Sequence, residues 1–478
     1  MERLNYDLVV VGAGSGGYAA ARTARDCGDC SIALVDRGPL GGLCILRGCM
    51  PSKALLASSD ALYDMGEAAQ LGIHAGAISA DVPFVVARKR ELVRGFADYR
   101  IEGIESFPLY RGAARFISRN ELQVGDDVIL QARKFIIATG SLIAPPAIDG
   151  LADAGYFDSD AALEREQIPK SLIVLGGGYV ACELGQYFAR MGAKTTFIIR
   201  AAHLLSGADD DVGNELTECF RQEGIEVVTG AKLVGVKSLE GKKAVRVVVD
   251  GVDGEIVADE IFYALGRVPD IEGLGLDVAG VDAHPTRGIA VDGLLRTSNP
   301  HIYAIGDVTG IFALVHVAIY QGEVAARNAL RDANEKANYD IVAAHTVFSD
   351  PQVAVVGKIE KDLKRAGTLY VKGTYAFAEH GKAMTLGKTK GFVKLLAEPT
   401  DGTILGATVI GPQASELIHE MIVAMNYNST VQEFVRIPHL HPTLAEIWTY
   451  PAEECAEQIG RHRPGDDPME LATSVHAH

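Results

Sequence analysis

The sequence has no apolar run long enough to cross a membrane and no excess of basic residues. Its 45 lysines and arginines stand against 62 aspartates and glutamates, which gives a formal net charge of −17. A nucleic-acid partner is not expected, because no positive excess is available to neutralise phosphates. The first residues lead into a strand-like segment instead of a signal peptide. We therefore expect a cytoplasmic protein with no membrane partner.

Cysteine is scarce and scattered, and the odd number of thiols does not suit a secreted disulfide scaffold. The seven residues are Cys27, Cys30, Cys44, Cys49, Cys182, Cys219 and Cys455. Cys27 and Cys30 form one CxxC pair without a second pair, whereas a zinc site needs four ligands. We interpret these two as incidental thiols at a helix end and expect no metal site. A cysteine pair that matters for function should be catalytic.

Glycine is abundant in one early segment that carries a nucleotide-binding pattern. Residues 7–11 form a short β-branched strand, a glycine turn follows, and the next residues favour a helix. Gly12 permits the tight turn, Gly14 lets a pyrophosphate approach the helix N-terminus, and Gly17 lets helix and strand pack closely. Asp36 ends the second strand, nineteen positions beyond Gly17, where an acid can accept ribose hydroxyl groups. Together these features predict a dinucleotide site.

The same pattern recurs in the middle of the chain. A strand over residues 171–175 leads into Gly176, Gly177 and Gly178 and then into a helix. The repeat predicts a second dinucleotide. Arg200 stands where an NAD-specific site would place an acid for the ribose 2′-hydroxyl, and an arginine can pair with a 2′-phosphate. The preference between NAD and NADP stays open.

Two later segments complete the pattern of an α/β chain. A strand from residue 302 delivers Asp307 at its carboxyl end, the edge where ligands bind in open α/β sheets. Beyond about residue 342 the pattern changes to alternating strands and a helix over 416–425, which is typical of a separate α+β domain. A polar tail follows from residue 461.

The segment 41–53, GGLCILRGCMPSK, resembles the redox-active disulfide signature of the class I pyridine nucleotide-disulfide oxidoreductases. The resemblance extends over nearly the whole chain, through both glycine loops and four shorter strings. These are Ala138-Thr139-Gly140, Gly266-Arg267, Gly306-Asp307 and HLHPTLAE at 439–446. The chain is therefore identified as a member of the class I pyridine nucleotide-disulfide oxidoreductase family. Within that family its motifs are most similar to those of the dihydrolipoyl dehydrogenases.

The resemblance implies a role for each cysteine of the signature. Cys44 is then the interchange thiol that attacks the substrate, and Cys49 is the flavin-side thiol. A pair five residues apart at the start of a helix can close a disulfide only over a short, distorted turn, and a strained bridge is easier to reduce. Taken without the flanking motif, two such cysteines would more often be inert core residues.

His441 and Glu446 resemble the family's acid–base pair, in which the carboxylate orients the imidazole. In relatives the pair comes from the other subunit, so the resemblance implies an active homodimer. The alternative is a capping histidine before a proline turn. His439 is expected to be structural. Lys53 and Glu183 resemble an ion pair beside the flavin, with solvated surface residues as the alternative.

The implied cofactors are FAD and either NAD+ or NADP+. The residues expected to bind FAD are Gly12, Gly14, Gly17, Asp36, Gly42, Lys53, Ala113, Thr139, Gly140 and Asp307. Those expected to bind NAD(P) are Gly176, Gly178, Glu183, Arg200 and Gly266. The expected fold is α/β, with two Rossmann-like domains and a C-terminal α+β dimerisation domain. The expected domains are 1–149 with 270–341 for FAD, 150–269 for NAD(P), 342–460 for dimerisation, and the tail 461–478.

The resemblance implies a dithiol/disulfide oxidoreductase, most similar to an enzyme that oxidises a protein-bound dihydrolipoyl group with NAD+. A mercuric reductase fits poorly, because that group carries a C-terminal cysteine pair and this chain has one distant cysteine there, Cys455. Arg200 favours an NADPH-dependent reductase of a small disulfide, although the second arginine usual in glutathione reductases is absent. Reduction of quinones or dyes is a further alternative.

Arg47 departs from the usual residues between the two cysteines. A permanent charge there could stabilise a thiolate or attract an anionic dithiol. The alternative is a surface arginine that faces solvent.

Overall fold

The computed structural model describes residues 1–74 and 76–460, so the expected polar tail at 461–478 lies outside the described residues. The chain forms two compact units, and each is described by itself. Unit 1 comprises Met1–Leu55, Pro83–Pro145 and Gly266–Val342, and unit 2 comprises Leu56–Val82, Pro146–Leu265 and the chain from Ala343 onward.

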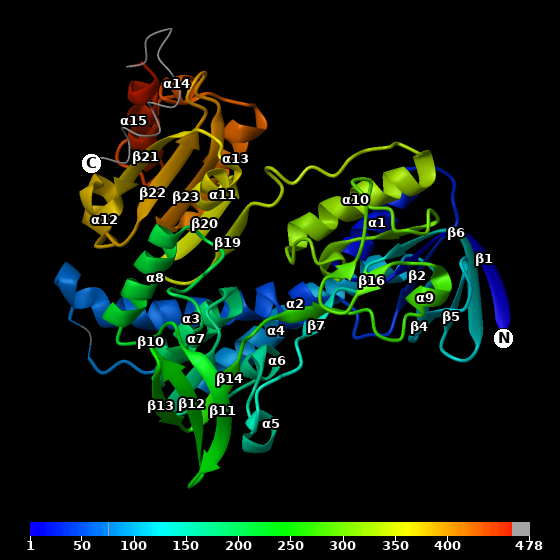
Figure 1. The fold of residues 1–478 in the computed structure, drawn as a ribbon, viewed down its shortest axis with the longest axis horizontal. Helices are drawn as coiled ribbons and strands as arrows, with labels where there is room; N and C mark the ends of the chain where they lie inside the picture. Colours follow the sequence, from blue (N-terminus) through cyan, green and yellow to red (C-terminus); the bar gives the residue numbers. More distant parts are fainter. Residues whose placement is uncertain (75, 461–478) are drawn as a thin grey trace. The chain divides into compact units, whose positions relative to one another are not determined.

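Unit 1 is built on a seven-stranded sheet whose centre is parallel (Figure 1). Its strands, in spatial order, are β3 (Leu109–Arg111), β2 (Ile32–Asp36), β1 (Glu2–Val11), β6 (Val128–Ile137), β5 (Glu121–Val124) and β4 (Ala114–Phe116), and β18 (Ile302–Ala304) pairs with β6. The β-branched and aliphatic residues 8–11 of β1 are almost fully buried. The parallel pairs β1–β2, β1–β6, β2–β3 and β6–β18 end at one edge, where the expected ligand-binding residues follow.

Two helices of unit 1 lie side by side, α1 (Ser15–Asp26) and α10 (Val315–Arg331) (Figure 1). A Cβ atom on Gly322 would meet the carbonyl oxygen of Gly16 at 2.4 Å, so the missing side chain permits this close approach. Smaller elements follow the sheet: β7 (Ser141–Ile143) pairs with β15 (Arg267–Pro269), β16 (Ala283–His284) pairs with β17 (Gly288–Ile289), and α9 is Leu276–Ala279. Three further helices are α2 (Leu43–Arg47), α3 (Cys49–Glu67) and α4 (Val82–Glu105).

Unit 2 contains the second glycine loop on a four-stranded parallel sheet. Its strands, in order, are β10 (Glu226–Val228), β9 (Lys194–Ile198), β8 (Ser171–Leu175) and β14 (Glu260–Tyr263). The helices α7 (Tyr179–Arg190) and α8 (Asp210–Gln222) follow β8 and β9. An antiparallel sheet of β11 (Lys232–Leu239), β12 (Lys242–Val249) and β13 (Val252–Ala258) lies between β10 and β14 in the sequence.

The C-terminal part of unit 2 is an antiparallel five-stranded sheet with helices, as its alternating pattern predicts. Its order is β19 (His345–Val347), β20 (Gln352–Gly357), β23 (Ile404–Gly411), β22 (Phe392–Ala397) and β21 (Val371–Ala376). Helix α13 (Ala414–Asn426) packs on β20 and β23, and α15 (Thr449–Gly460) packs on β21 and β22. The shorter helices are α11 (Glu360–Ala366), α12 (Gly381–Leu386) and α14 (Val431–Phe434), with 3-10 turns η3 (Phe377–Glu379) and η4 (Ala445–Trp448).

A buried ion cluster joins α8 to the C-terminal sheet inside unit 2. Lys394 on β22 is fully buried, and its Nζ lies 2.7 Å from a carboxylate oxygen of Asp209 and 2.9 Å from Asp211. Glu360, at the start of α11, contributes a third carboxylate at 3.5 Å. A buried ammonium group needs such partners, because an unpaired charge in the interior is costly.

The expected fold class is confirmed. Strand β6 ends at Ile137, and the separate short strand β7 begins at Ser141. Of the helices in the described part of the chain, none has the length and apolar character needed to cross a membrane.

Candidate active site

The first glycine loop has the close packing that its sequence predicts. Gly12 has a φ of +104°, and a Cβ atom there would lie 2.3 Å from the carbonyl oxygen of Ala138. A Cβ atom on Gly17 would lie 1.8 Å from the oxygen of Gly12. Helix α1 begins at Ser15, and its N-cap residue Gly14 has no side chain to bond the first amide groups. Those N–H groups suit a phosphate, which fits the expected dinucleotide.

Asp36 lies beside this loop, at the carboxyl end of β2. Its two carboxylate oxygens accept hydrogen bonds from the backbone N–H groups of Ala13, at 2.7 Å, and Gly38, at 2.6 Å. A carboxylate has about four lone-pair positions, so two remain for the hydroxyl groups of a ribose. The loop and the acid together therefore fit an FAD nucleotide.

Further expected FAD residues follow neighbouring strands at the same edge. Thr139 and Gly140 follow β6, and the Thr139 hydroxyl donates to the carbonyl oxygen of Asp270 at 2.7 Å. Asp307 follows β18, and its carboxylate accepts a 2.7 Å bond from the Ser141 hydroxyl.

Ala113 lies just beyond β3, at the carboxyl end of that strand, and its carbonyl oxygen accepts a bond from the N–H of Gly125. The parallel strands thus bring Asp36, Ala113, Thr139 and Asp307 to one edge of the sheet. Their roles in binding stay predictions.

Gly42 brings the cysteine segment to the first glycine loop. A Cβ atom on Gly42 would lie 2.7 Å from the Cα atom of Gly14, so the two backbones touch. Gly42 is the N-cap of α2, and its φ of 80° lies in the region that glycine favours. Cys44 follows in the first turn of α2, close to the expected pyrophosphate site.

Cys44 and Cys49 lie on successive helices, α2 and α3, and both are thiols rather than half-cystines in this structure. A hydrogen bond between the two side chains, together with burial, raises the pKa of the Cys44 thiol, whereas the charge of Lys53 acts in the opposite direction. The Lys53 ammonium group donates to the Ser52 hydroxyl at 3.4 Å. The pairing of the cysteines and their expected roles stay predictions.

Arg47 is the last residue of α2, and its side chain is exposed. The structure thus places a cation on the helix that carries Cys44. An effect of this charge on the thiol stays a prediction, and the alternative is an arginine that only faces solvent.

The second glycine loop repeats the geometry of the first. Gly176 has a φ of +121°, and a Cβ atom there would lie 2.4 Å from the carbonyl oxygen of Ala264. Gly178 caps α7 without a side-chain bond, so the first amides of this helix also suit a phosphate. Arg200 is exposed two residues beyond β9, at the carboxyl edge of this sheet.

The structure shows a hydrogen bond for each of two further residues expected at the nucleotide site, and their binding roles stay predictions. Glu183 is buried in α7 and accepts a 3.0 Å bond from the backbone N–H of Phe348. Gly266, with a φ of +116°, belongs to unit 1, where its carbonyl oxygen accepts a bond from the N–H of Ala144. The pairing of Glu183 with Lys53 stays a prediction, because the two residues belong to different units.

His441 and Glu446, the expected acid–base pair, contact each other, and their catalytic role stays a prediction. The Nδ1 atom of His441 lies 3.0 Å from Oε2 of Glu446, while the imidazole is 78% exposed and the carboxylate 12% exposed. This arrangement leaves Nε2 of His441 accessible for a proton and holds Nδ1 against the carboxylate of Glu446. His439 bonds instead to Glu420 at 2.6 Å and to the carbonyl oxygen of Ile437, as a structural residue would.

One residue beside this pair was not found from the sequence. His380 is fully buried, and its Nε2 atom lies 3.6 Å from Oε1 of Glu446, the carboxylate oxygen that does not face His441. No local motif signals this contact, because His380 precedes α12 and lies far from Glu446 in the sequence.

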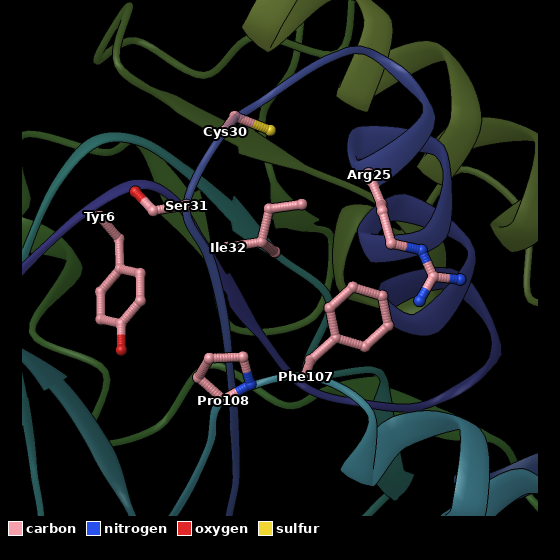
Figure 2. Close-up of a pocket in the computed structure, with 7 residues that line it drawn as sticks. All are labelled: Tyr6, Arg25, Cys30, Ser31, Ile32, Phe107 and Pro108. Atoms are coloured by element: carbon pink, nitrogen blue, oxygen red, sulfur yellow. The ribbon is translucent and has the colours of Figure 1, made fainter.

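A separate pocket of about 210 Å³ opens in unit 1, near the amino end of β2 (Figure 2). It is lined by Tyr6, Arg25, Cys30, Ser31, Ile32, Phe107 and Pro108. The guanidinium group of Arg25 lies over the ring of Phe107 at 4.9 Å, and the Cys30 thiol donates to the carbonyl oxygen of Ala24. The glycine loop follows the carboxyl end of β1, at the opposite edge of the sheet, so this pocket is not part of the candidate active site.

Comparison with known proteins gives matches over most of the chain. The profile of the pyridine nucleotide-disulphide oxidoreductases matches residues 6–322, and the profile of their dimerisation domain matches residues 343–452. The dihydrolipoyl dehydrogenase of Geobacillus stearothermophilus is 36% identical over 94% of this chain and 95% of that protein. The mercuric reductase of Streptomyces lividans is 34% identical over 95% of this chain and 97% of its own length.

A solved structure has the same fold. It is the Cu(II) complex of the HOCl-induced flavoprotein disulfide reductase RclA from Escherichia coli, with a TM-score of 0.83 and 23% identity over 94% of this chain and 99% of that one. The protein is therefore a flavin-dependent oxidoreductase that uses FAD and NAD(P), and the match to the dimerisation domain supports a homodimer. The chain belongs to the pyridine nucleotide-disulphide oxidoreductase family.

Proposed function

We propose that this enzyme oxidises a dihydrolipoyl group carried on a protein arm and passes the electrons to NAD+. The observation that carries the proposal is the His441–Glu446 pair, which presents an exposed, carboxylate-oriented imidazole for a thiol proton. Several relatives of similar length are named dihydrolipoyl dehydrogenase, at 34–36% identity. Cys455 is fully buried, so it does not offer the accessible C-terminal thiol expected of a mercuric reductase.

In this proposal the side chains carry out two thiol–disulfide exchanges. His441 takes the proton of one substrate thiol, and the resulting thiolate attacks the Cys44 sulfur of a Cys44–Cys49 disulfide, so that Cys49 leaves as a thiolate. The second substrate thiol attacks the substrate sulfur of the mixed disulfide, and its proton passes to Cys44 as this residue is released. The products are a cyclic substrate disulfide and a reduced cysteine pair.

Glu446 holds the imidazole of His441 in one orientation and stabilises its protonated form. By analogy with relatives, the pair acts on the cysteines of the partner subunit, so a homodimer would be required. Bound FAD would accept the electron pair of the dithiol and return it as hydride to the nicotinamide.

The proposal is tested by rapid anaerobic mixing of the purified enzyme with dihydrolipoamide, NADH and NADPH in separate experiments, while the absorbance of the flavin is followed. Fast reduction by dihydrolipoamide, reversed by NAD+, is expected. A fast response to NADPH together with no response to dihydrolipoamide would contradict the proposal.

A second candidate function is the NADPH-dependent reduction of a small disulfide. Arg200 favours it, because an exposed guanidinium at the end of β9 can pair with a 2′-phosphate. Steady-state assays with glutathione disulfide and either nucleotide distinguish the two candidates.

Electron transfer to quinones or dyes is a further candidate that needs no cysteine pair. Alkylation of the reduced cysteines separates it from the others. A dithiol dehydrogenase loses its main activity after alkylation, whereas a quinone reductase keeps its activity.

A further inference from the structure

We propose that His380 is a positioning residue of the acid–base pair: its imidazole holds the second carboxylate oxygen of Glu446 and so limits the negative charge available to His441. This inference rests on the proposed acid–base role of His441. It assigns a function to a histidine outside every recognised motif of the chain.

The geometry around Glu446 carries the proposal. His441 contacts Oε2 of the carboxylate at 3.0 Å, and Nε2 of His380 faces Oε1 at 3.6 Å. The carboxylate thus lies between two imidazoles, one exposed and one fully buried. A shortening of roughly half an ångström would make the inner contact an ordinary N–H···O hydrogen bond.

The burial of His380 favours a hydrogen bond to Glu446. Neither ring nitrogen of His380 has a hydrogen-bond partner within the described part of the chain. A buried imidazole must keep one N–H group, and an unpaired donor in the interior is costly. Oε1 of Glu446 is the acceptor that Nε2 faces, so the tautomer with the proton on Nε2 is the one that the site favours.

The charge state of His380 follows from the same surroundings. Burial lowers the pKa of His380 and a protonated His441 lowers it further, whereas the charge of Glu446 opposes both. His380 therefore stays neutral while it donates to Glu446, and His441 is the ring that takes the proton. Because one carboxylate contacts both rings, the charge of His441 acts on His380.

The titratable groups that face His380 come from three elements. Glu446 and Tyr450 lie on η4 and α15, and the ring of Tyr450 meets the imidazole edge-on at 6.2 Å. Tyr375 on β21 stacks on Tyr450 at 3.9 Å. His441 acts on His380 through its charge. Glu446 and His441 are therefore the charged groups that act on His380.

The test replaces His380 in the full-length holoenzyme and follows the titration of His441. His380→Phe keeps an aromatic ring and removes the donor, whereas His380→Gln places an amide N–H at a similar reach. Phe377→Leu is the matched control, because Phe377 is fully buried and packs edge-on against His380, so its replacement disturbs the packing of the imidazole without removing a donor. The ring signals of His441 are followed against pH by NMR, with His441→Gln to assign them.

We expect His380→Phe to raise the midpoint of the His441 titration by about one pH unit, the size that loss of one bond to a charged group gives. His380→Gln should restore the midpoint to within a few tenths of a unit of wild type. The acid limb of flavin reduction by dihydrolipoamide should move in parallel. An unchanged or lowered midpoint in His380→Phe, or an equal shift in Phe377→Leu, would overturn the proposal.

A measurement on the unaltered enzyme does not depend on the folding of any variant. The ¹⁵N shifts of the His380 ring should show a neutral imidazole with its proton on Nε2, and a proton on Nδ1 would contradict the inference. Both NMR readouts need no substrate. If dihydrolipoamide fails to reduce the wild-type enzyme, the proposed function fails, while the ring titrations still decide the role of His380.

Discussion

Cys44 and Cys49 share one hydrogen bond, and Lys53 acts on the same thiol by its charge. A substitution at either cysteine therefore removes a hydrogen-bond partner of the other. Arg47 and Lys53 place two cations on the helices that carry this pair. A single substitution in this pair should therefore distinguish the oxidation of a dithiol from the oxidation of a reduced nucleotide.

Cys44→Ser should abolish oxidation of dihydrolipoamide, with a loss on the order of 10³-fold, because serine cannot replace the sulfur nucleophile. Reduction of an artificial dye by NADH or NADPH should remain, since it does not need the cysteine pair. Cys30→Ser is the control, because Cys30 lines the separate pocket of unit 1. Retention of dithiol turnover in Cys44→Ser would refute the role given to this cysteine.

Arg200→Glu tests the nucleotide preference. If the guanidinium pairs with a 2′-phosphate, the substitution should raise the KM for NADPH about tenfold or more and leave that for NADH unchanged or lower. The two KM values are measured in a dye-reduction assay. Equal changes in the two KM values would show that Arg200 does not distinguish a 2′-phosphate from a 2′-hydroxyl.

At the scale of secondary-structure elements, each of the two nucleotide loops combines a strand end, a glycine turn and a helix N-terminus without a side-chain cap. Gly12 and Gly176 have the same positive φ region and the same close approach to a neighbouring strand. Such a unit is local in sequence, so the pattern alone predicts it. The position of Asp36 follows from the parallel pairing of β1 and β2.

Gly17→Ala should sharply reduce the flavin content of the purified protein. A Cβ atom there would lie 1.8 Å from the oxygen of Gly12, so the helix must move away from the strand. The ratio of flavin to protein absorbance measures the effect. Gly95→Ala is the matched control, since its Cβ atom meets nothing within 4 Å. A normal flavin ratio in Gly17→Ala would contradict the expected packing.

Glu360 should make the fold sensitive to acid. Burial alone raises the pKa of this carboxyl, but hydrogen bonds from Lys364 and Tyr370 and the charges of Lys372 and Lys394 lower it to about 2, from an ordinary value of 4.5. Because the folded-state pKa is the lower one, the stabilisation is present above pH 4.5 and is lost as the pH falls toward 2.

Glu360→Gln should therefore destabilise the protein near neutral pH, by roughly 2 kcal/mol after solvent screening, and the difference from wild type should shrink in acid. Thermal denaturation at about pH 7 and about pH 3.5 compares the two proteins. Glu379→Gln, at an exposed site, is the control. An equal difference at both pH values would exclude this ion cluster as the cause.

Local motifs identified Asp36, His441 and Glu446, because each lies in a short string whose spacing carries the chemistry. They could not identify His380 or Lys394, whose partners come from distant parts of the sequence. Burial of such side chains depends on which strands pair and which helices cover them. The fold class and the contact of His441 with Glu446 were therefore predictable, whereas the contacts of His380 and Lys394 were not.

At the scale of the whole molecule, exposed apolar side chains on α13 and in the segments that follow it agree with the match to a dimerisation domain. Val423 is 57% exposed and Tyr427, one turn later, is 76% exposed. Leu440, next to His441, is 80% exposed. Exposed apolar side chains of this size are common at protein interfaces.

The double substitution Val423→Glu with Tyr427→Glu should give a monomer in size-exclusion chromatography with light scattering. Dithiol oxidation should fall with the dimer, because the proposed acid–base pair acts across the interface, while dye reduction should persist. Val252→Glu is the control, since Val252 is 70% exposed on β13, outside the dimerisation domain. A monomer with full dithiol activity would refute the cross-subunit arrangement.

The buried Lys394 limits how this protein can be divided for study. Its carboxylate partners Asp209 and Asp211 belong to the segment expected to bind NAD(P), although Lys394 itself lies in the C-terminal sheet. A fragment that begins at residue 343 would keep the ammonium group and one carboxylate, and a fragment that ends at residue 265 would keep two carboxylates without their cation. Expression of either piece alone should give insoluble or protease-sensitive material, so crystallisation and engineering efforts should retain both segments in one polypeptide.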